Sequence, residues 1–403
     1  MNLCISRYLL GTNRHLVCSR ETGLFSWEDT VPENAWLYGN SPNCVMSLND
    51  LCLLFNVDPR DKPPEKYVSA YTAVGFAGGL SVPWHLSLPK WVFQKFISDL
   101  VEDLWSVLDK IDDTTYREKF LNNRKTLTAL KESHIDTLEL RRILRNEKNP
   151  TLVSTLKSFN PKEGEVLSAP VYQQGSTGRT IVKRGPKILT LKKEFRSILK
   201  SRYPGGKLIQ LDYTSLEPRI MLALSGKAHV NDVYSYVAQE SGIDLNRGKL
   251  KIATMGALYG ISAVRLQSMI SRDADASIVL EKIRKIFKIN ELSNSLVREC
   301  DDGKTVLNYY GRPLTFTKCD THLLVSHYVQ STGVDVCLDG FGKIISEIEN
   351  KNLKISPVYI IHDALILDVS PDDHDKIPSL LKIGSKIDKF DMDFPISVSN
   401  IRQ

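Results

Sequence analysis

The sequence lacks any segment able to cross a membrane, and it lacks the cysteine patterns typical of disulfides or zinc sites. No window of the 403 residues approaches eighteen consecutive apolar residues, and the N-terminus has no charged start followed by a long apolar stretch. The seven cysteines form neither a C-x-x-C pair nor an even set, and no histidine lies at zinc-ligand spacing from them. These absences favour a cytoplasmic protein with free thiols and no membrane partner.

Internal repeats and low-complexity tracts are absent as well, and the net charge is small. A formal charge of +6 does not by itself indicate a nucleic-acid partner, and 42% hydrophobic with 25% charged residues is ordinary for a folded chain of two to four domains. Basic residues are concentrated between 177 and 207, where Glu194 is the single acid. The ten cations of this segment are Arg179, Lys183, Arg184, Lys187, Lys192, Lys193, Arg196, Lys200, Arg202 and Lys207. Such a run is either a solvated face or a contact for a polyanion.

Hydrophobic periodicity changes along the first half of the chain. Residues 1–88 contain short β-type runs such as 35–38, broken by turn-rich stretches. From Trp91 onward, apolar residues recur every three or four positions and predict one amphipathic helix. A second helix is predicted over 127–144, so the two would form an antiparallel helical arm that ends at the Pro- and Gly-containing segment 159–164.

Two aspartates lie in runs that otherwise suit β-strands. Asp212 ends the run 208–212, and Asp363 interrupts the run 358–369, which reads as two strand halves. A buried carboxylate is unfavourable unless it is paired. If both strands belong to one antiparallel sheet, the two carboxylates lie side by side and either share a proton or bind a cation, for which Mg²⁺ is the natural candidate. Each aspartate taken alone could equally be a turn or cap residue.

A helix predicted over 247–260 carries a line of side chains that suits a nucleoside triphosphate. Two cations, an apolar side chain and an aromatic one follow at intervals of four residues: Arg247, Lys251, Met255 and Tyr259. Guanidinium and ammonium groups bind phosphate oxygens, whereas the apolar pair offers surface to a base and sugar. The same line also fits an ordinary amphipathic surface helix.

Three motifs in register resemble those of the family A (Pol I-like) DNA polymerases. DYTSLEPR (212–219) resembles the first palm motif, R-x3-K-x3-M-G-x2-YG (247–260) the fingers-helix motif, and YIIHDALI (359–366) the second palm motif. Further similarities are found in STGR (176–179), QSTGVD (330–335) and DFPISV (393–398). The resemblance covers about residues 159–403.

The resemblance implies a mixed α+β, right-hand polymerase fold with an antiparallel-sheet palm, helical fingers and a helical thumb, plus a small N-terminal α/β segment. The implied segments are 1–88 for the N-terminal part of unknown role, 89–158 for the thumb, 159–235 and 326–403 for the two parts of the palm, and 236–325 for the fingers. Residues 1–88 would be a reduced exonuclease-like remnant or a docking surface for a processivity or exonuclease partner.

The resemblance also implies the reaction, which is template-directed addition of dNTPs to the 3′-hydroxyl of a primer by two-metal-ion phosphoryl transfer. Asp212 and Asp363 would bind two Mg²⁺ ions, for which Mn²⁺ could substitute, and the backbone carbonyl of Tyr213 would complete the first site. Arg247 and Lys251 would neutralise phosphate charge, with Lys251 donating a proton to the leaving pyrophosphate.

Other matches imply contacts to the sugar and to primer-template DNA. Glu217 would block a ribose 2′-hydroxyl, with Tyr259 packed beside it. The remaining residues implied to lie near the nucleotide or the DNA are Met255, Arg179, Gln330, His362 and Gly260.

The sequence departs from the family pattern at five positions. Ala364 follows the second aspartate where Glu is usual, and Met255 replaces an aromatic residue; both departures are similar to single-subunit RNA polymerases. His322 and Ser326 stand where the family has Arg and Asn, and Pro218 follows the gate glutamate. Alternatives to a DNA polymerase are therefore an RNA polymerase or primase-like enzyme, and a catalytically weak DNA-binding subunit.

No exonuclease motif is found in residues 1–88. Asp29, Glu33 and Asp50 are scattered and lack a strand-borne D-x-E pattern, so the sequence predicts no proofreading activity. The expected location is the cytoplasm of a bacterium, or the host cytoplasm if the protein is viral.

Overall fold

The computed structural model describes residues 1–39, 44–73, 88–112, 116–175, 177–227, 230–270, 274–301, 305–314, 321–390 and 392–401. The chain divides into two compact units, Met1–Arg124 and Lys125–Gln403, and the division falls within helix α6 (Arg117–Thr128).

The first unit is a four-stranded sheet with helices. Its strands have the order β3-β2-β1-β4, in which β1 pairs antiparallel with β2 and parallel with β4. The strands are β1 (Asn2–Ile5), β2 (His15–Ser19), β3 (Phe25–Glu28) and β4 (Ala35–Tyr38). The helices are α1 (Arg7–Leu10), α2 (Leu48–Leu54), α3 (Glu65–Ala73), α5 (Lys90–Asp112) and the first part of α6. The run predicted as a strand over 35–38 is confirmed as β4, which is buried at all four positions.

Helix α5 confirms the periodicity that predicted it. Leu100, Leu104, Leu108 and Ile111 are fully buried, because their spacing of three and four residues places them on one face. The polar residues between them face the solvent, so the helix is amphipathic along most of its length.

The second predicted helix, over 127–144, is wrong. Helix α6 ends at Thr128, strand β5 (Ser133–Ile135) follows, and α7 (Thr137–Asn146) begins only after it. The apolar spacing misled because Leu138 is 76% exposed and does not extend a stripe. Instead, β5 pairs antiparallel with both β6 and β9, and these ladder hydrogen bonds override the helical pattern.

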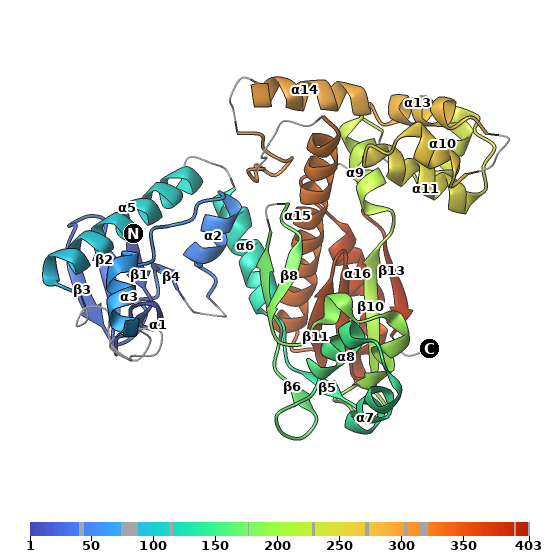
Figure 1. Ribbon diagram of the computed structural model, residues 1–403. Helices are drawn as coiled ribbons and strands as arrows, with labels where there is room; N and C mark the ends of the chain where they lie inside the picture. The colour runs from blue at the N-terminus through green and yellow to red at the C-terminus, as the bar shows by residue number, and fades with distance from the viewer. Residues whose placement is uncertain are drawn as a thin grey trace. The chain divides into compact units, whose positions relative to one another are not determined.

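The centre of the second unit is an antiparallel sheet that carries both aspartates. Its strands are β10 (Lys207–Tyr213), β11 (Ile355–Ile361), β12 (Ala364–Val369) and β13 (Ile396–Asn400), in the order β11-β12-β10-β13. The strand predicted over 208–212 and the two strand halves over 358–369 are confirmed as β10 and the β11–β12 hairpin. Helices α15 (Thr321–Asn350) and α16 (Ile377–Ser385) lie side by side on one face of the sheet (Figure 1).

Tyr213 of β10 packs closely against α15 and α16, at positions where both helices carry glycine. The Tyr213 ring packs on Phe341 with centroids 5.5 Å apart, and its hydroxyl donates to the carbonyl of Gly384 in α16 at 2.7 Å. A Cβ at Gly340 of α15 would lie 1.8 Å from the Tyr213 hydroxyl oxygen, so only glycine allows this contact.

A largely helical part follows β10 in the chain and has its own hydrophobic core. Its helices are α9 (Leu216–Leu224), α10 (Val233–Ser241), α11 (Arg247–Leu258), α12 (Ala263–Gln267), α13 (Ala276–Ile286) and α14 (Ile289–Asp301). The helix predicted over 247–260 is therefore confirmed as α11, with Tyr259 at its C-cap.

The remaining elements of the second unit are short. They are α8 (Pro150–Lys157), β6 (Val166–Leu167), β7 (Val171–Gln174), β8 (Thr180–Arg184), β9 (Leu199–Lys200) and the 3-10 turns η2 (Ile188–Thr190), η3 (Lys193–Ile198) and η4 (Pro371–Lys376). Strands β7 and β8 form the hairpin that carries Arg179. Over the described parts of the chain, no helix is both long and apolar enough to cross a bilayer.

Candidate active site

Strand pairing brings the two predicted aspartates together. Asp212 in β10 is directly opposite Ala364, the first residue of β12, and Asp363 immediately precedes it in the turn of the β11–β12 hairpin. The backbone N–H of Tyr213 donates to the carbonyl of Asp363 at 3.3 Å, which fixes the turn against the end of β10. The antiparallel arrangement expected from the sequence is therefore present.

Two residues beside the aspartates have left-handed backbone conformations that are unfavourable for side chains. His362, immediately before Asp363, has φ +54°, and Ser215, three residues after Asp212, has φ +55°. Such a conformation costs roughly 1–2 kcal/mol for a non-glycine residue. Strained backbone of this kind is often found at functional sites, where the surrounding structure holds it in place.

The surroundings of Asp212 disfavour its charged form. Burial and the nearby charge of Asp363 raise the pKa of Asp212, whereas a long hydrogen bond of 3.5 Å from the side-chain amide of Gln210 opposes this. Gln210 in turn accepts a hydrogen bond at 2.9 Å from Arg196, whose Nε atom is buried without a partner. A divalent cation between the aspartates would offset the unfavourable charge.

The donors present fit a divalent metal. In the described part of the chain, neither Asp212 nor Asp363 forms an ion pair within 4 Å with a basic side chain, so both carboxylates are available. Because the Tyr213 hydroxyl donates to Gly384 and its ring packs on Phe341, any metal ligand from Tyr213 would be its backbone carbonyl. Within the described residues, no group of three or more acidic, histidine or cysteine side chains is placed to hold a metal ion. Two carboxylates are nevertheless a usual protein contribution to Mg²⁺, whose other ligands are water and substrate phosphates.

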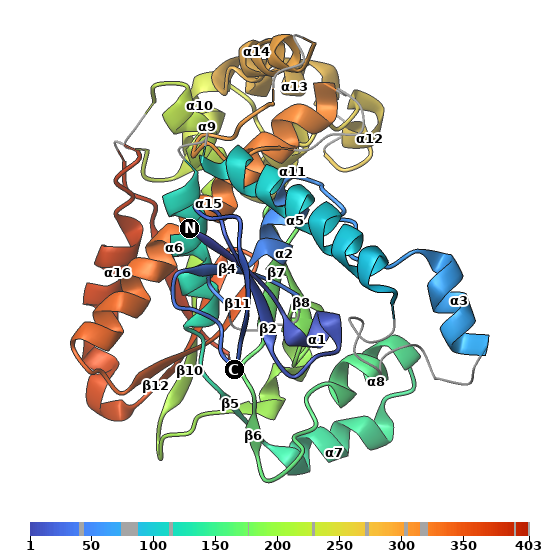
Figure 2. The same ribbon diagram turned by 90° about the vertical axis from the view of Figure 1, so that its left-hand side faces the viewer.

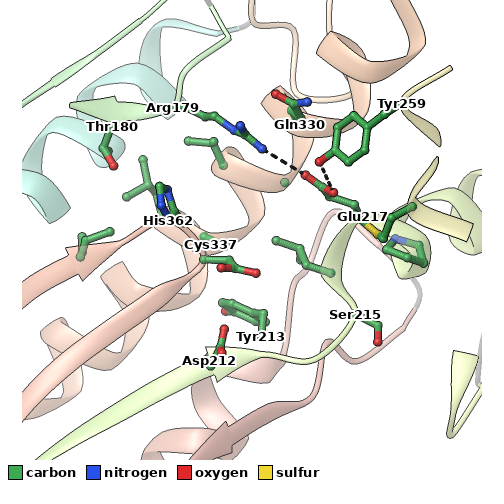
Figure 3. Close-up of a pocket in the computed structure, with 18 of the residues that line it drawn as sticks. Arg179, Thr180, Asp212, Tyr213, Ser215, Glu217, Tyr259, Gln330, Cys337 and His362 are labelled. Carbon is green, nitrogen blue, oxygen red and sulfur yellow. Dashed lines mark hydrogen bonds and ion pairs between the residues drawn. The ribbon is translucent and has the colours of Figure 1, made fainter. Parts of the chain in front are cut away.

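The aspartates line a cavity of about 390 Å³ between β10, α9, α11, α15 and the β11–β12 turn (Figure 3). Ten of the residues predicted from the sequence lie on its wall: Arg179, Asp212, Tyr213, Glu217, Lys251, Met255, Tyr259, Gln330, His362 and Asp363. Arg247 and Gly260, which the sequence also predicted, are not among the lining residues.

Glu217 accepts two polar contacts in this cavity. The Tyr259 hydroxyl donates to Glu217 Oε2 at 2.5 Å, and the Arg179 guanidinium forms an ion pair with Oε1 at 3.8 Å (Figure 3). Burial raises the pKa of Glu217, and these two partners act in the opposite direction. The carboxylate is therefore held at a fixed position on the wall, with its apolar stem against α15 at Gly333.

Arg247 has a protein partner in the structure, on the helix that precedes its own. Its guanidinium forms an ion pair with Asp232 at 3.1 Å and lies 5.1 Å from the ring centroid of Tyr234, and 63% of its side chain is exposed. Asp232 is partly buried, which raises its pKa, but hydrogen bonds from Ser235 and Arg247 prevail and lower it to about 2.

Several lining residues were missed by sequence reasoning. Ser215 and Leu216 belong to the motif over 212–219 and were not singled out within it, whereas Tyr234 had no signal, because nothing in its local pattern places it near Asp212. Val334 and Cys337 could have been found, since they lie one and two turns from Gln330 on the same face of α15.

The positions that depart from the family pattern are placed as follows. Ala364 is buried in β12, Pro218 is buried in the first turn of α9, and Met255 is half-buried on the cavity wall. Ser326 is buried in α15 and donates to the carbonyl of Leu323 at 3.0 Å. The side chain of His322 lies outside the described residues, as does Ser176 of the STGR motif.

The fold and the paired aspartates define a polymerase-type module, and comparison with known proteins shows its family. The model for DNA polymerase family A matches residues 98–400, more than half of the chain, and the chain belongs to this family. Among solved structures, it is similar to the POL domain of Pol1 from M. smegmatis in complex with DNA primer-template and dNTP. That match has 12% sequence identity, covers 99% of this chain and 94% of that chain, and has a TM-score of 0.68. The predicted mixed α+β polymerase fold is thereby confirmed.

Proposed function

We propose that this protein is a DNA-directed DNA polymerase that extends a primer with dNTPs by two-metal-ion phosphoryl transfer. The single observation that carries this proposal is the juxtaposition of Asp212 and Asp363 on the wall of a cavity that also holds Lys251 and Glu217. Membership of family A supports it, since family A polymerases generally use two Mg²⁺ ions.

Asp212, Asp363 and the carbonyl of Tyr213 would hold the metal ions. When bound, Mg²⁺ lowers the pKa of the primer 3′-hydroxyl and neutralises charge on the triphosphate. The β-sheet and the backbone bond from Tyr213 to Asp363 keep the two carboxylates in place before substrate arrives, which limits reorganisation during the reaction.

Lys251 and Arg247 would bind the triphosphate. Lys251 lines the cavity one turn from Met255, so its ammonium can reach a phosphate and donate a proton to pyrophosphate. Arg247 precedes Lys251 by one turn and would exchange Asp232 for outer phosphate oxygens, because a highly charged triphosphate competes well for a guanidinium.

Glu217 would select deoxyribose. Its carboxylate is fixed by Tyr259 and Arg179, so a ribose 2′-hydroxyl at this wall would meet a side chain that cannot easily move. The RNA polymerase alternative, which rests on Met255 and Ala364, therefore has less support than DNA synthesis. Met255 would cover the base and sugar.

Arg179, Gln330, His362 and Gly260 would contact primer-template DNA. The first three line the cavity, and Arg179 is 54% exposed despite its ion pair, so it can also reach a strand. We further propose the segment roles predicted from the sequence: thumb for 89–158, fingers for 236–325 and palm for 159–235 with 326–403.

We also propose that the chain does not proofread. Two of the three carboxylates considered for an exonuclease have other partners, because Asp29 pairs with Arg14 at 2.9 Å and Asp50 with Arg124 at 3.0 Å. Purified protein supplied with metal should leave a mismatched primer end intact. Measurable shortening of that primer would contradict this part of the proposal, and would give residues 1–88 a role beyond that of a remnant or a docking surface.

The principal experiment is primer extension with wild type, Asp212→Ala and Asp363→Ala. Each variant should lose more than about 10³-fold in rate, since each removes a ligand that acts in the transition state. Asp375→Ala, an exposed carboxylate of the same unit, is the matched control and should be unchanged. Near wild-type extension by either variant would refute the metal assignment, and salt-sensitive DNA binding without extension by wild type would favour the binding subunit.

A further inference from the structure

A second cavity, of about 400 Å³, lies in the first unit and has no part in the chemistry above. It is lined by the loop over 60–64, the first turn of α3 and the first three turns of α5. Helices α3 and α5 begin close together (Figure 2). With the exception of Asp99, its lining residues precede the segment matched by the family model.

Aromatic and apolar side chains form the floor and one wall of this cavity. Phe96 and Val92 are buried beneath it, Tyr67 is half-buried, and Trp91 is 65% exposed. An indole left open to water beside a hollow is available for stacking on a planar ligand.

The charged rim is mostly cationic. Arg60 holds the loop over 60–64 against α5, because its guanidinium donates to Asp103 at 2.7 and 2.9 Å and pairs with Glu102. These acidic partners raise the pKa of Arg60. Within the described part of the chain, neither Lys62 nor Lys66 has an ion pair, and the Lys66 ammonium lies 4.9 Å from the Tyr67 ring centroid.

The fourth cation, Lys95, forms an ion pair but remains accessible to solvent. Its ammonium lies 3.2 Å from Asp99, the single acid among the described lining residues, but 70% of the Lys95 side chain is exposed. Three lysines therefore line an aromatic cavity in which Asp99, the one carboxylate among the described lining residues, already has a partner.

We propose that this cavity binds a nucleotide unit of a single-stranded nucleic acid. A base would stack on Trp91 and Tyr67, and the flanking phosphates would contact Lys62, Lys66 and Lys95. Stacking platforms edged by basic side chains are how proteins hold single strands without regard to sequence. An acidic peptide could use the lysines, but it has no planar base for the exposed indole. The inference rests on this local chemistry and does not depend on the catalytic assignment.

The first test measures binding of a short fluorescent oligo-dT strand to the full-length protein by anisotropy. Trp91→Ala should weaken binding at least about fivefold, whereas Trp91→Phe, which keeps an aromatic face, should retain most of the affinity. Lys62→Gln combined with Lys66→Gln should reduce the slope of log affinity against log salt by about 1.4, because each lost phosphate contact accounts for about 0.7. Lys110→Gln, an exposed lysine at the other end of α5, is the matched control.

The second test locates the strand. Oligo-dT containing 5-iodouracil should photocrosslink within peptides that include Tyr67 or Trp91. Primer extension with a short template overhang should be normal for Trp91→Ala, so failure of this inference and failure of the polymerase proposal are distinguishable. Unchanged oligo-dT affinity for Trp91→Ala, or crosslinks only within 125–403, would overturn the inference. The inference would also be overturned if the protein bound an acidic peptide, and not oligo-dT, in a way that depends on Trp91. Binding of dTMP as tight as binding of oligo-dT would overturn it too.

Discussion

At the residue scale, the carboxylate of Glu217 has well-defined surroundings. Its two oxygens have different partners, Tyr259 on one and Arg179 on the other. Because these partners hold the carboxylate in one position, it would obstruct a ribose 2′-hydroxyl both by its volume and by its charge. This differs from a flexible acid, which could swing away from a ribose at little cost.

Glu217→Ala should reduce the preference for dTTP over UTP by at least about tenfold, since it removes the obstacle to a 2′-hydroxyl. Tyr259→Phe should have a smaller effect, because the ion pair with Arg179 remains. The measurement is single-nucleotide incorporation of each substrate on one template. Tyr236→Phe, on α10 and not a lining residue, serves as the control. A selectivity for dTTP that is unaffected in Glu217→Ala would exclude this residue as the sugar gate.

Gln210 lies between Arg196 and Asp212 and should influence the catalytic carboxylate without contacting substrate. Gln210→Ala should lower the extension rate several-fold and raise the Mg²⁺ concentration for half-maximal rate, because Asp212 loses a donor and Arg196 loses its acceptor. Ser399→Ala, opposite Gln210 in the β10–β13 register, is the control. Mg²⁺ titration of the extension rate tests this, and an identical Mg²⁺ dependence in both variants would contradict it.

At the element scale, the β7–β8 hairpin that carries Arg179 is held by buried groups. Arg312 is 1% exposed and pairs with Asp335 of α15 at 2.8 Å, and Asn308 also donates to Asp335 at 2.7 Å. Gly178 has φ +77°, and a Cβ there would lie 2.7 Å from the Arg312 guanidinium carbon. The hairpin tip thus fits directly on a buried ion pair that cannot readily move.

Gly178→Ala should therefore displace Arg179 and weaken primer-template binding several-fold. It should also destabilise the fold by more than the roughly 1–2 kcal/mol expected for a left-handed alanine alone. Gly164→Ala provides the comparison, because Gly164 has φ +61° with open space around its Cβ. Urea unfolding and DNA-binding titrations of both variants decide the matter. If both variants lost the same unfolding free energy and the same DNA affinity, contact with Arg312 would be unimportant.

The ion pair between α10 and α11 should make a pH-dependent contribution to stability. Because the pKa of Asp232 is lowered to about 2, its charge stabilises the folded chain above the unfolded pKa of about 3.9, and this contribution is lost as pH falls towards 2. Asp232→Asn keeps a capping oxygen but removes the charge, so it should be slightly less stable than wild type at pH 7. Urea unfolding from pH 7 to 3 should show that the free energies of unfolding of wild type and Asp232→Asn converge only below about pH 4. A difference in unfolding free energy that is the same at every pH would contradict a stabilising charge on Asp232.

The sequence predicted secondary structure correctly where the apolar pattern fits only one kind of element. Alternating and continuous apolar runs identified β10 and the β11–β12 hairpin, and a period of three to four residues identified α5 and α11. Sequence reasoning failed at β5, whose three residues form a strand only because β6 and β9 lie beside them. The partner of Arg247 was also unpredictable, since Asp232 is fifteen residues away and belongs to another helix.

At the scale of the whole molecule, the two units differ in how much their sequences revealed. In Lys125–Gln403, motifs separated by about 150 residues converge on one cavity, because β10 pairs with β12 across that distance. In Met1–Arg124, the sequence predicted one strand and one helix but no sheet order and no cavity. Short strands pair through long-range contacts that local composition does not encode.

If Asp212 and Asp363 hold divalent ions beneath an incoming nucleotide, their loss should be visible in metal binding itself, which can be measured without turnover. Mn²⁺ binding is measured by electron paramagnetic resonance on the protein with a dideoxy-terminated primer-template and the matching dNTP. Wild type should bind two ions cooperatively with the dNTP, whereas Asp212→Asn and Asp363→Asn should lose at least one of them. Mn²⁺ binding equal to that of wild type in both variants would contradict the account.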